Sequence, residues 1–98
     1  MKVNIQAIDF NAKEQLEEFV QKKAEKLEQY SDKISAVDVH MKVVKPEVSN
    51  NKEVMLKVEI PGKSLVVIKT ADSFEEAYDH CQEVAIKLII KEKEKNQK

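Results

Sequence analysis

The sequence contains no arginine, no tryptophan, one glycine and one cysteine. Because arginine is absent, all 17 cationic side chains are lysines, and any contact with phosphate is a point-charge contact rather than a bidentate guanidinium contact. The single cysteine, Cys81, excludes an intrachain disulfide. The single glycine, Gly62, excludes a glycine-rich phosphate loop.

The motifs of common catalytic and metal sites are missing as well. The sequence has no CxxC, HExxH or GxSxG pattern. The two histidines, His40 and His80, lie far apart in the sequence, and we interpret them as surface side chains rather than metal ligands. We therefore expect a protein that is not an enzyme and that uses no cofactor, no metal ion and no small-molecule substrate.

Long apolar runs are also absent. No stretch approaches the roughly 20 apolar residues of a membrane span, and the N-terminal segment MKVNIQAIDF has no long apolar core. We expect a cytoplasmic protein that does not bind membranes. The 98 residues suffice for one domain, which we place at residues 1–98.

The most informative stretch that is present runs from Ser73 to Lys95. Ser73 and Glu76 form an S-x-x-E capping box, and no glycine or proline follows, so one long helix is predicted. At about 100° per residue, the apolar side chains form a stripe that should face a core. The stripe consists of Phe74, Ala77, Tyr78, Cys81, Ala85, Leu88 and Ile89. We interpret Cys81 as a buried structural thiol.

Lysines recur on one flank of this predicted helix. Lys87, Lys91 and Lys95 are spaced i, i+4, i+8, and the segment from Lys87 onward carries a net charge of +3 within a chain of net charge −1. A second cluster, Lys22, Lys23 and Lys26, lies on an earlier predicted helix. If the helices pack side by side, the six lysines could make one basic surface or groove. Each lysine–phosphate contact would add affinity and salt dependence but no base specificity.

The opposite flank of the last helix carries two isoleucines one turn apart, Ile86 and Ile90. They lie outside the predicted core stripe. Either the first helix or a loop covers them, or they form an apolar contact patch for a protein partner or for weak self-association. The pattern does not decide between these alternatives.

Periodicity assigns the rest of the chain to strands and one more helix. Alternating apolar side chains predict strands at Lys2–Ile8, Ile34–Lys45, Glu53–Ile60 and Ser64–Ala71. An N-x-x-E capping box at Asn11 opens a helix that extends to about Gln29. Turn-forming residues predict a hairpin loop at Pro46–Lys52 and a tight turn at Pro61–Lys63. Residues 96–98 are expected to fray.

The order β-α-β-β-β-α favours an α+β two-layer sandwich. Its four-stranded sheet should carry both helices on one face, with the last three strands as an antiparallel meander. The opposite face of the sheet, with Asp38, His40, Lys42, Lys57 and Glu59, should be solvated.

This order, together with two short motifs, resembles the short ribosome hibernation-promoting factors. That family includes the ribosome-associated inhibitor called protein Y, historically named a sigma-54 modulation protein. The stretch AEKLEQY, from Ala24 to Tyr30, is similar to the K-L-E-aromatic ending of the family's first helix. DSFEEAYD, from Asp72 to Asp79, is similar to the family's passage from the last strand into the last helix.

The resemblance implies a non-catalytic factor that binds the small ribosomal subunit. Such a factor would contact 16S rRNA in the channel between head and body, occlude the mRNA and tRNA sites, and inhibit translation in stationary phase or stress. It would be the short form, without a ribosome-dimerising tail. By resemblance, the family's basic residues correspond to Lys23, Lys26, Lys87 and Lys91.

The chain departs from the family pattern in its last helix. Family members are denser in arginine and lysine there, whereas the run from Val84 to Ile90 holds one cation, Lys87. We expect this departure to weaken the contact with rRNA. The alternative function is a protein-interaction module that acts through the last helix.

Overall fold

The computed structural model describes residues 1–45, 47 and 49–95, and within them the predicted order of elements is confirmed. Pro46 and Val48 of the predicted hairpin loop, and the fraying expected at 96–98, lie outside the described residues. The elements are β1 (Lys2–Ile8), α1 (Glu14–Glu25), the 3₁₀ helix η1 (Lys26–Gln29), β2 (Ala36–Val43), β3 (Lys52–Ile60), β4 (Lys63–Ala71) and α2 (Phe74–Lys95).

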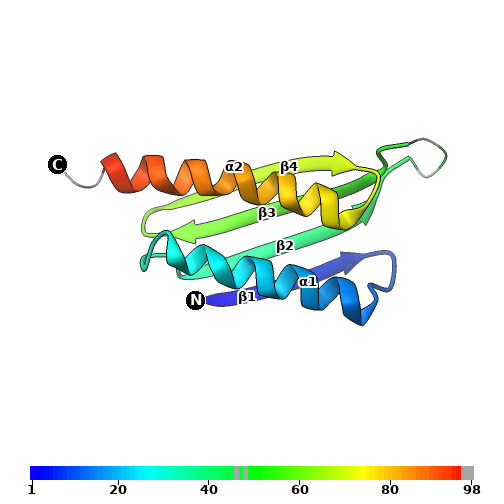
Figure 1. Ribbon diagram of the computed structural model, residues 1–98, viewed down its shortest axis with the longest axis horizontal. Coiled ribbons are helices and arrows are strands. Elements are labelled where there is room, and N and C mark those ends of the chain that lie inside the picture. Colours follow the sequence, from blue (N-terminus) through cyan, green and yellow to red (C-terminus); the bar gives the residue numbers. More distant parts are fainter. Residues whose placement is uncertain (46, 48, 96–98) are drawn as a thin grey trace.

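The described strands form one sheet in the order β1-β2-β3-β4. β2, β3 and β4 are the expected antiparallel meander, whereas β1 pairs with β2 in parallel. A parallel pair needs a crossover connection, and α1 with η1 supplies it. Both helices lie on the same face of the sheet, so the fold is the predicted α+β sandwich (Figure 1).

The core fills the space between the sheet and the helices. Alternate residues of the three meander strands point into it: Val37, Val39, Met41, Val54, Leu56, Val58, Leu65 and Val67. From α2, every residue of the predicted stripe is buried except Leu88, which is half-buried. On the other face of the sheet, polar side chains satisfy one another: Asn4 donates a hydrogen bond to Asp38, and Lys57 pairs with Glu59.

The two predicted capping boxes have different outcomes. The Ser73 hydroxyl oxygen accepts a hydrogen bond of 3.1 Å from the backbone N–H of Glu76, as predicted. The prediction at Asn11 is wrong, because α1 begins at Glu14 and its N-cap is Lys13, whose side chain accepts no hydrogen bond. A side chain caps a helix only from the position directly before its first residue, and Asn11 lies two residues too early.

The turn between β3 and β4 explains the position of the one glycine. Ile60 pairs with Lys63, so the hairpin loop consists of Pro61 and Gly62. Gly62 has a φ of 75°, a conformation that glycine adopts without the steric cost of a side chain. Pro61 comes directly before Gly62, and its ring fixes its own φ near the value that this position of the turn requires.

Cys81 belongs to α2, and its side chain is fully buried between this helix and the sheet, as predicted. Its sulfur lies 3.3 Å from the carbonyl oxygen of Val54 and 3.7 Å from that of Val67, so the thiol can donate a weak hydrogen bond to the sheet. Burial raises the pKa of the Cys81 thiol to about 11. At neutral pH the thiol is therefore protonated and shielded from reagents.

This burial predicts both the reactivity of Cys81 and an alkaline loss of stability. A thiol reagent such as DTNB should label the protein at neutral pH only when it unfolds. Because the folded pKa is raised, the stabilisation is complete below pH 9 and is lost as the pH rises toward 11. The free energy of unfolding should fall by roughly 2–3 kcal/mol more in the wild type than in Cys81→Ala across that range. Rapid labelling of the folded protein would contradict the prediction.

Candidate nucleic-acid interface

The two helices run side by side in the same direction, so their C-terminal ends lie at the same end of the molecule (Figure 1). Two observations agree with this arrangement. Lys23 of α1 forms an ion pair with Asp79 of α2. The residues that follow η1, beginning at Ser31, line a cavity together with Ile89 and Lys93 near the end of α2.

Charge is distributed unevenly along each helix. Acidic residues occupy the first turns, with Glu14 in α1 and Glu75 in α2, whereas lysines occupy the last turns. This distribution stabilises each helix through its dipole. Because the helices are parallel, it also gathers lysines at one end of the molecule, which we call the basic end. The basic end consists of Lys22, Lys23, Lys26, Lys87, Lys91, Lys93 and Lys95.

Four of the six predicted binding residues are available to an external anion. Lys22, Lys26, Lys87 and Lys91 are exposed, and none of them forms an ion pair with another described residue. A free ammonium group can contact phosphate without first breaking an internal contact. These four lysines are therefore the strongest candidates for polyanion contacts.

The other two predicted residues are already engaged. The Lys23 ammonium lies 3.1 Å from an Asp79 carboxylate oxygen and 5.4 Å from the centre of the Phe19 ring. Lys95 lies 3.9 Å from Glu92, which it shares with Lys63. Both lysines must exchange these contacts for phosphate, so each should contribute less than a free lysine.

The two lysine clusters do not face each other as two walls of a groove. The α1-facing side of α2 is marked by Asp79, which pairs with Lys23, and by Lys93, which lines the cavity with Ser31. Lys91 precedes Lys93 by two residues and therefore points about 160° away from it. The flank with Lys87 and Lys91 thus faces away from α1, toward the side of β4.

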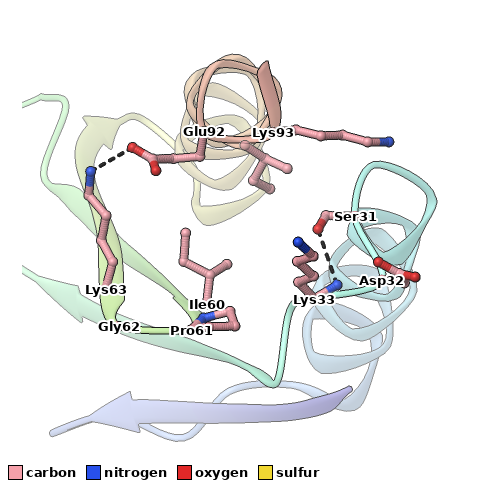
Figure 2. A pocket seen from close by; sticks show the side chains of 10 residues that line it. Ser31, Asp32, Lys33, Ile60, Pro61, Gly62, Lys63, Glu92 and Lys93 are labelled. Atoms are coloured by element: carbon pink, nitrogen blue, oxygen red, sulfur yellow. Dashed lines mark hydrogen bonds and ion pairs between the residues drawn. The ribbon is translucent and has the colours of Figure 1, made fainter. Parts of the chain in front are cut away.

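Beside the basic end lies a cavity of about 830 Å³. Its apolar lining includes Ile60, Pro61 and Ile89. Lys63, the first residue of β4, donates a hydrogen bond to Glu92 on α2 (Figure 2). The hydrogen bond from Lys63 is the main cause that lowers the pKa of Glu92.

Three lysines contribute to the lining of this cavity: Lys33, Lys63 and Lys93. Reasoning from sequence did not include them in the basic surface. No local spacing links a connector, a turn and a helix end, so only the tertiary fold brings these lysines together.

The two isoleucines of α2, predicted to be either covered or part of an exposed apolar patch, differ from each other. Ile86 is half-buried and packs against the core, so it is largely covered. Ile90 is 42% exposed. One exposed isoleucine is common on soluble proteins and does not form a patch.

Two kinds of site find no support among the described residues. No group of three His, Cys, Asp or Glu side chains is placed where it could hold a metal ion. Neither helix in the described part of the chain is long and apolar enough to cross a membrane.

The difference between the isoleucines can be measured with matched substitutions. Ile86→Lys should lower the free energy of unfolding by about 1–3 kcal/mol, because it places an ammonium group against the core. Ile90→Lys should change it by less than about 0.5 kcal/mol, because the side chain can reach water. Urea unfolding of both variants checks this, and equal effects would show that the two positions do not differ in burial as described.

Comparison with known proteins identifies the family. The family model described as "Sigma 54 modulation protein / S30EA ribosomal protein" matches residues 3–97. The fold is similar to that of a ribosomal subunit interface protein from Coxiella burnetii, with a TM-score of 0.80 and 20% identity over 95% of this chain and 98% of that one.

It is also similar to the N-terminal domain of Thermus thermophilus Protein Y, with a TM-score of 0.77 and 15% identity over 93% of this chain and 98% of that one. At these identities the structures show a common fold. A search of curated proteins found no significant match. Since the family model covers almost the entire sequence, the chain belongs to the Sigma 54 modulation protein / S30EA ribosomal protein family.

Proposed function

We propose that this protein is a non-catalytic ribosome-binding factor of the cytoplasm. It occupies the mRNA and tRNA channel of the small subunit through contacts with 16S rRNA, and so inhibits translation in stationary phase or stress. The observation that carries the proposal is the family match over residues 3–97. The structural relative from Coxiella burnetii is described as a ribosomal subunit interface protein, which is consistent with it.

The basic end is the surface that would contact rRNA. Lys22, Lys26, Lys87 and Lys91 are exposed and free of internal ion pairs among the described residues. Each can neutralise a phosphate and release condensed counterions, which contributes affinity that falls as salt rises. Lys23 and Lys95 are secondary contacts because they are engaged with Asp79 and Glu92.

The distribution of charge also orients the protein, although its net charge is only −1. The N-terminal turns of both helices are acidic, and the basic end is about one helix length away. A polyanion repels the first and attracts the second, so the field orients the molecule as it approaches. A small net charge is therefore compatible with rRNA binding.

Removing charge from the exposed α2 lysines tests the proposal. The double variant Lys87→Gln/Lys91→Gln should bind small subunits more weakly than wild type in sucrose-gradient sedimentation. It should also lower the slope of log affinity against log salt by about 1.5, because each lost phosphate contact removes roughly 0.7–0.9. The control Lys13→Gln/Lys45→Gln makes the same change in net charge at two exposed lysines near the opposite end of the molecule and should bind like wild type.

A second matched pair tests the role of internal contacts. Lys26→Gln should weaken binding more than Lys23→Gln, because Lys23 must leave Asp79 before it can contact phosphate. Thermal unfolding of every variant confirms that the fold is retained. Binding that is absent at low salt, or that does not respond to salt, would refute the proposal.

A further inference from the structure

Strand β4 is an open edge of the sheet. It pairs with β3 on one side and has no partner strand on the other among the described residues. It spans nine residues, Lys63–Ala71, and contains neither proline nor glycine. An edge of this length presents a row of unpaired backbone N–H and C=O groups, to which another strand can add.

Apolar side chains flank this edge on the open face of the sheet. Val66 and Ile68 are 50% and 56% exposed, the highest values among the large hydrophobic residues that the structure describes as exposed. Ile68 lies opposite Met55 of β3 in the register, which is half-buried and extends the apolar surface inward. A monomer gains nothing from this exposure, and natural sheets usually place charged or polar residues at such positions.

A second apolar group flanks the edge in the helix layer. Val84 lies on the side of α2 that faces away from α1, and it is half-buried. Asp79, five residues earlier, pairs with Lys23 of α1 and points about 140° away from Val84. The β4 edge is thus bordered by Val66 and Ile68 below the backbone groups and by Val84 above them.

The opposite edge of the sheet is different. β1 is shorter, at seven residues, and its outward face carries Lys2, Asn4 and Gln6, all exposed. Asn4 also donates its amide hydrogen to Asp38. Polar residues of this kind protect an edge against further pairing. Of the two edges, β4 is therefore the one at which a further strand is more readily added.

We propose that two copies of this chain associate through their β4 strands, which pair in antiparallel orientation about a two-fold axis and join the sheets into one of eight strands. With Val67 at the axis, Val66 of each copy lies opposite Ile68 of the other, so both exposed side chains become cross-strand neighbours. Such pairs stabilise antiparallel sheets.

The positions of the lysines in β4 are compatible with pairing between two copies of this strand. In this register Lys63 lies opposite Ala71 and Lys69 lies opposite Leu65, so no two lysines face each other. An axis one residue earlier would place Lys63 opposite Lys69, which like-charge repulsion disfavours. The strand is therefore self-complementary in the register that also pairs Val66 with Ile68.

The helix layer fits the same arrangement by distance, and it brings the flanks with Lys87 and Lys91 near each other. α2 packs over both β3 and β4, so its axis lies about half a strand spacing inside the edge. With strands about 4.8 Å apart, pairing at β4 would place the two α2 helices roughly 10 Å from each other. That is the distance at which helices pack, and their Val84 sides would face each other.

Sedimentation velocity of the full chain, from low micromolar to near-millimolar concentration, tests the proposal. We expect a reversible dimer. Ile68→Lys should weaken it by about tenfold or more, because the lysine disrupts two symmetry-related apolar pairs. Ile90→Lys is the matched control on α2 and should leave the dimer intact. A monomer at every concentration, or a dimer lost only in Ile90→Lys, would overturn the proposal.

Cysteine cross-linking tests the register independently. Ser64 and Thr70 lie opposite each other across the proposed axis, at a separation that a disulfide can span. An oxidised mixture of Ser64→Cys and Thr70→Cys should form the heterodimeric disulfide, whereas neither variant alone should cross-link. Cys81 is buried and should not interfere. A dimer whose mixture fails to cross-link would show that the interface is not the proposed β4 pairing.

Discussion

The direction of the strands determines where the lysines of the candidate binding surface lie. β1 and β2 are parallel, and the meander returns β4 to the same direction. α1 follows β1 and α2 follows β4, so each helix must run back along the sheet, and the two helices become parallel (Figure 1). A β1 strand paired in the opposite sense would reverse α1 and place its lysines at the acidic start of α2. The parallel β1–β2 pair is therefore the constraint on which the basic end depends.

Two independent causes combine at that end. Within each helix, acidic first turns and basic last turns are favoured by the dipole, a local effect worth about 0.3–1 kcal/mol per charge. Because the topology makes the helices parallel, both acidic first turns lie at one end of the molecule and both basic last turns lie at the other. A chain of net charge −1 thus acquires an acidic end and a basic end without any concentrated cationic segment. A local basic surface of this kind can attract a polyanion even when the net charge is small.

The sequence predicts the elements well because their signals are local. Alternation of apolar residues located every strand to within two residues, and the Ser73 cap located the start of α2. The Asn11 cap failed because Lys13 occupies the N-cap position, which composition does not reveal. The site was only partly predictable. The six lysines follow from spacing, but the engagement of Lys23 with Asp79 depends on how α1 packs against α2, which no local pattern encodes.

Ribosome binding and self-association should respond to salt in opposite directions. The flank of α2 that carries Lys87 and Lys91 faces the β4 side, so pairing through β4 would bring two lysine flanks close together. Their repulsion is strongest at low salt and is screened as salt rises, since the Debye length falls from about 30 Å at 0.01 M to about 8 Å at 0.15 M. The proposed contact between lysines and rRNA would weaken over the same range. If both proposals hold, low salt would favour the monomer bound to RNA and higher salt would favour the pair, because the Lys87 and Lys91 flank borders both surfaces.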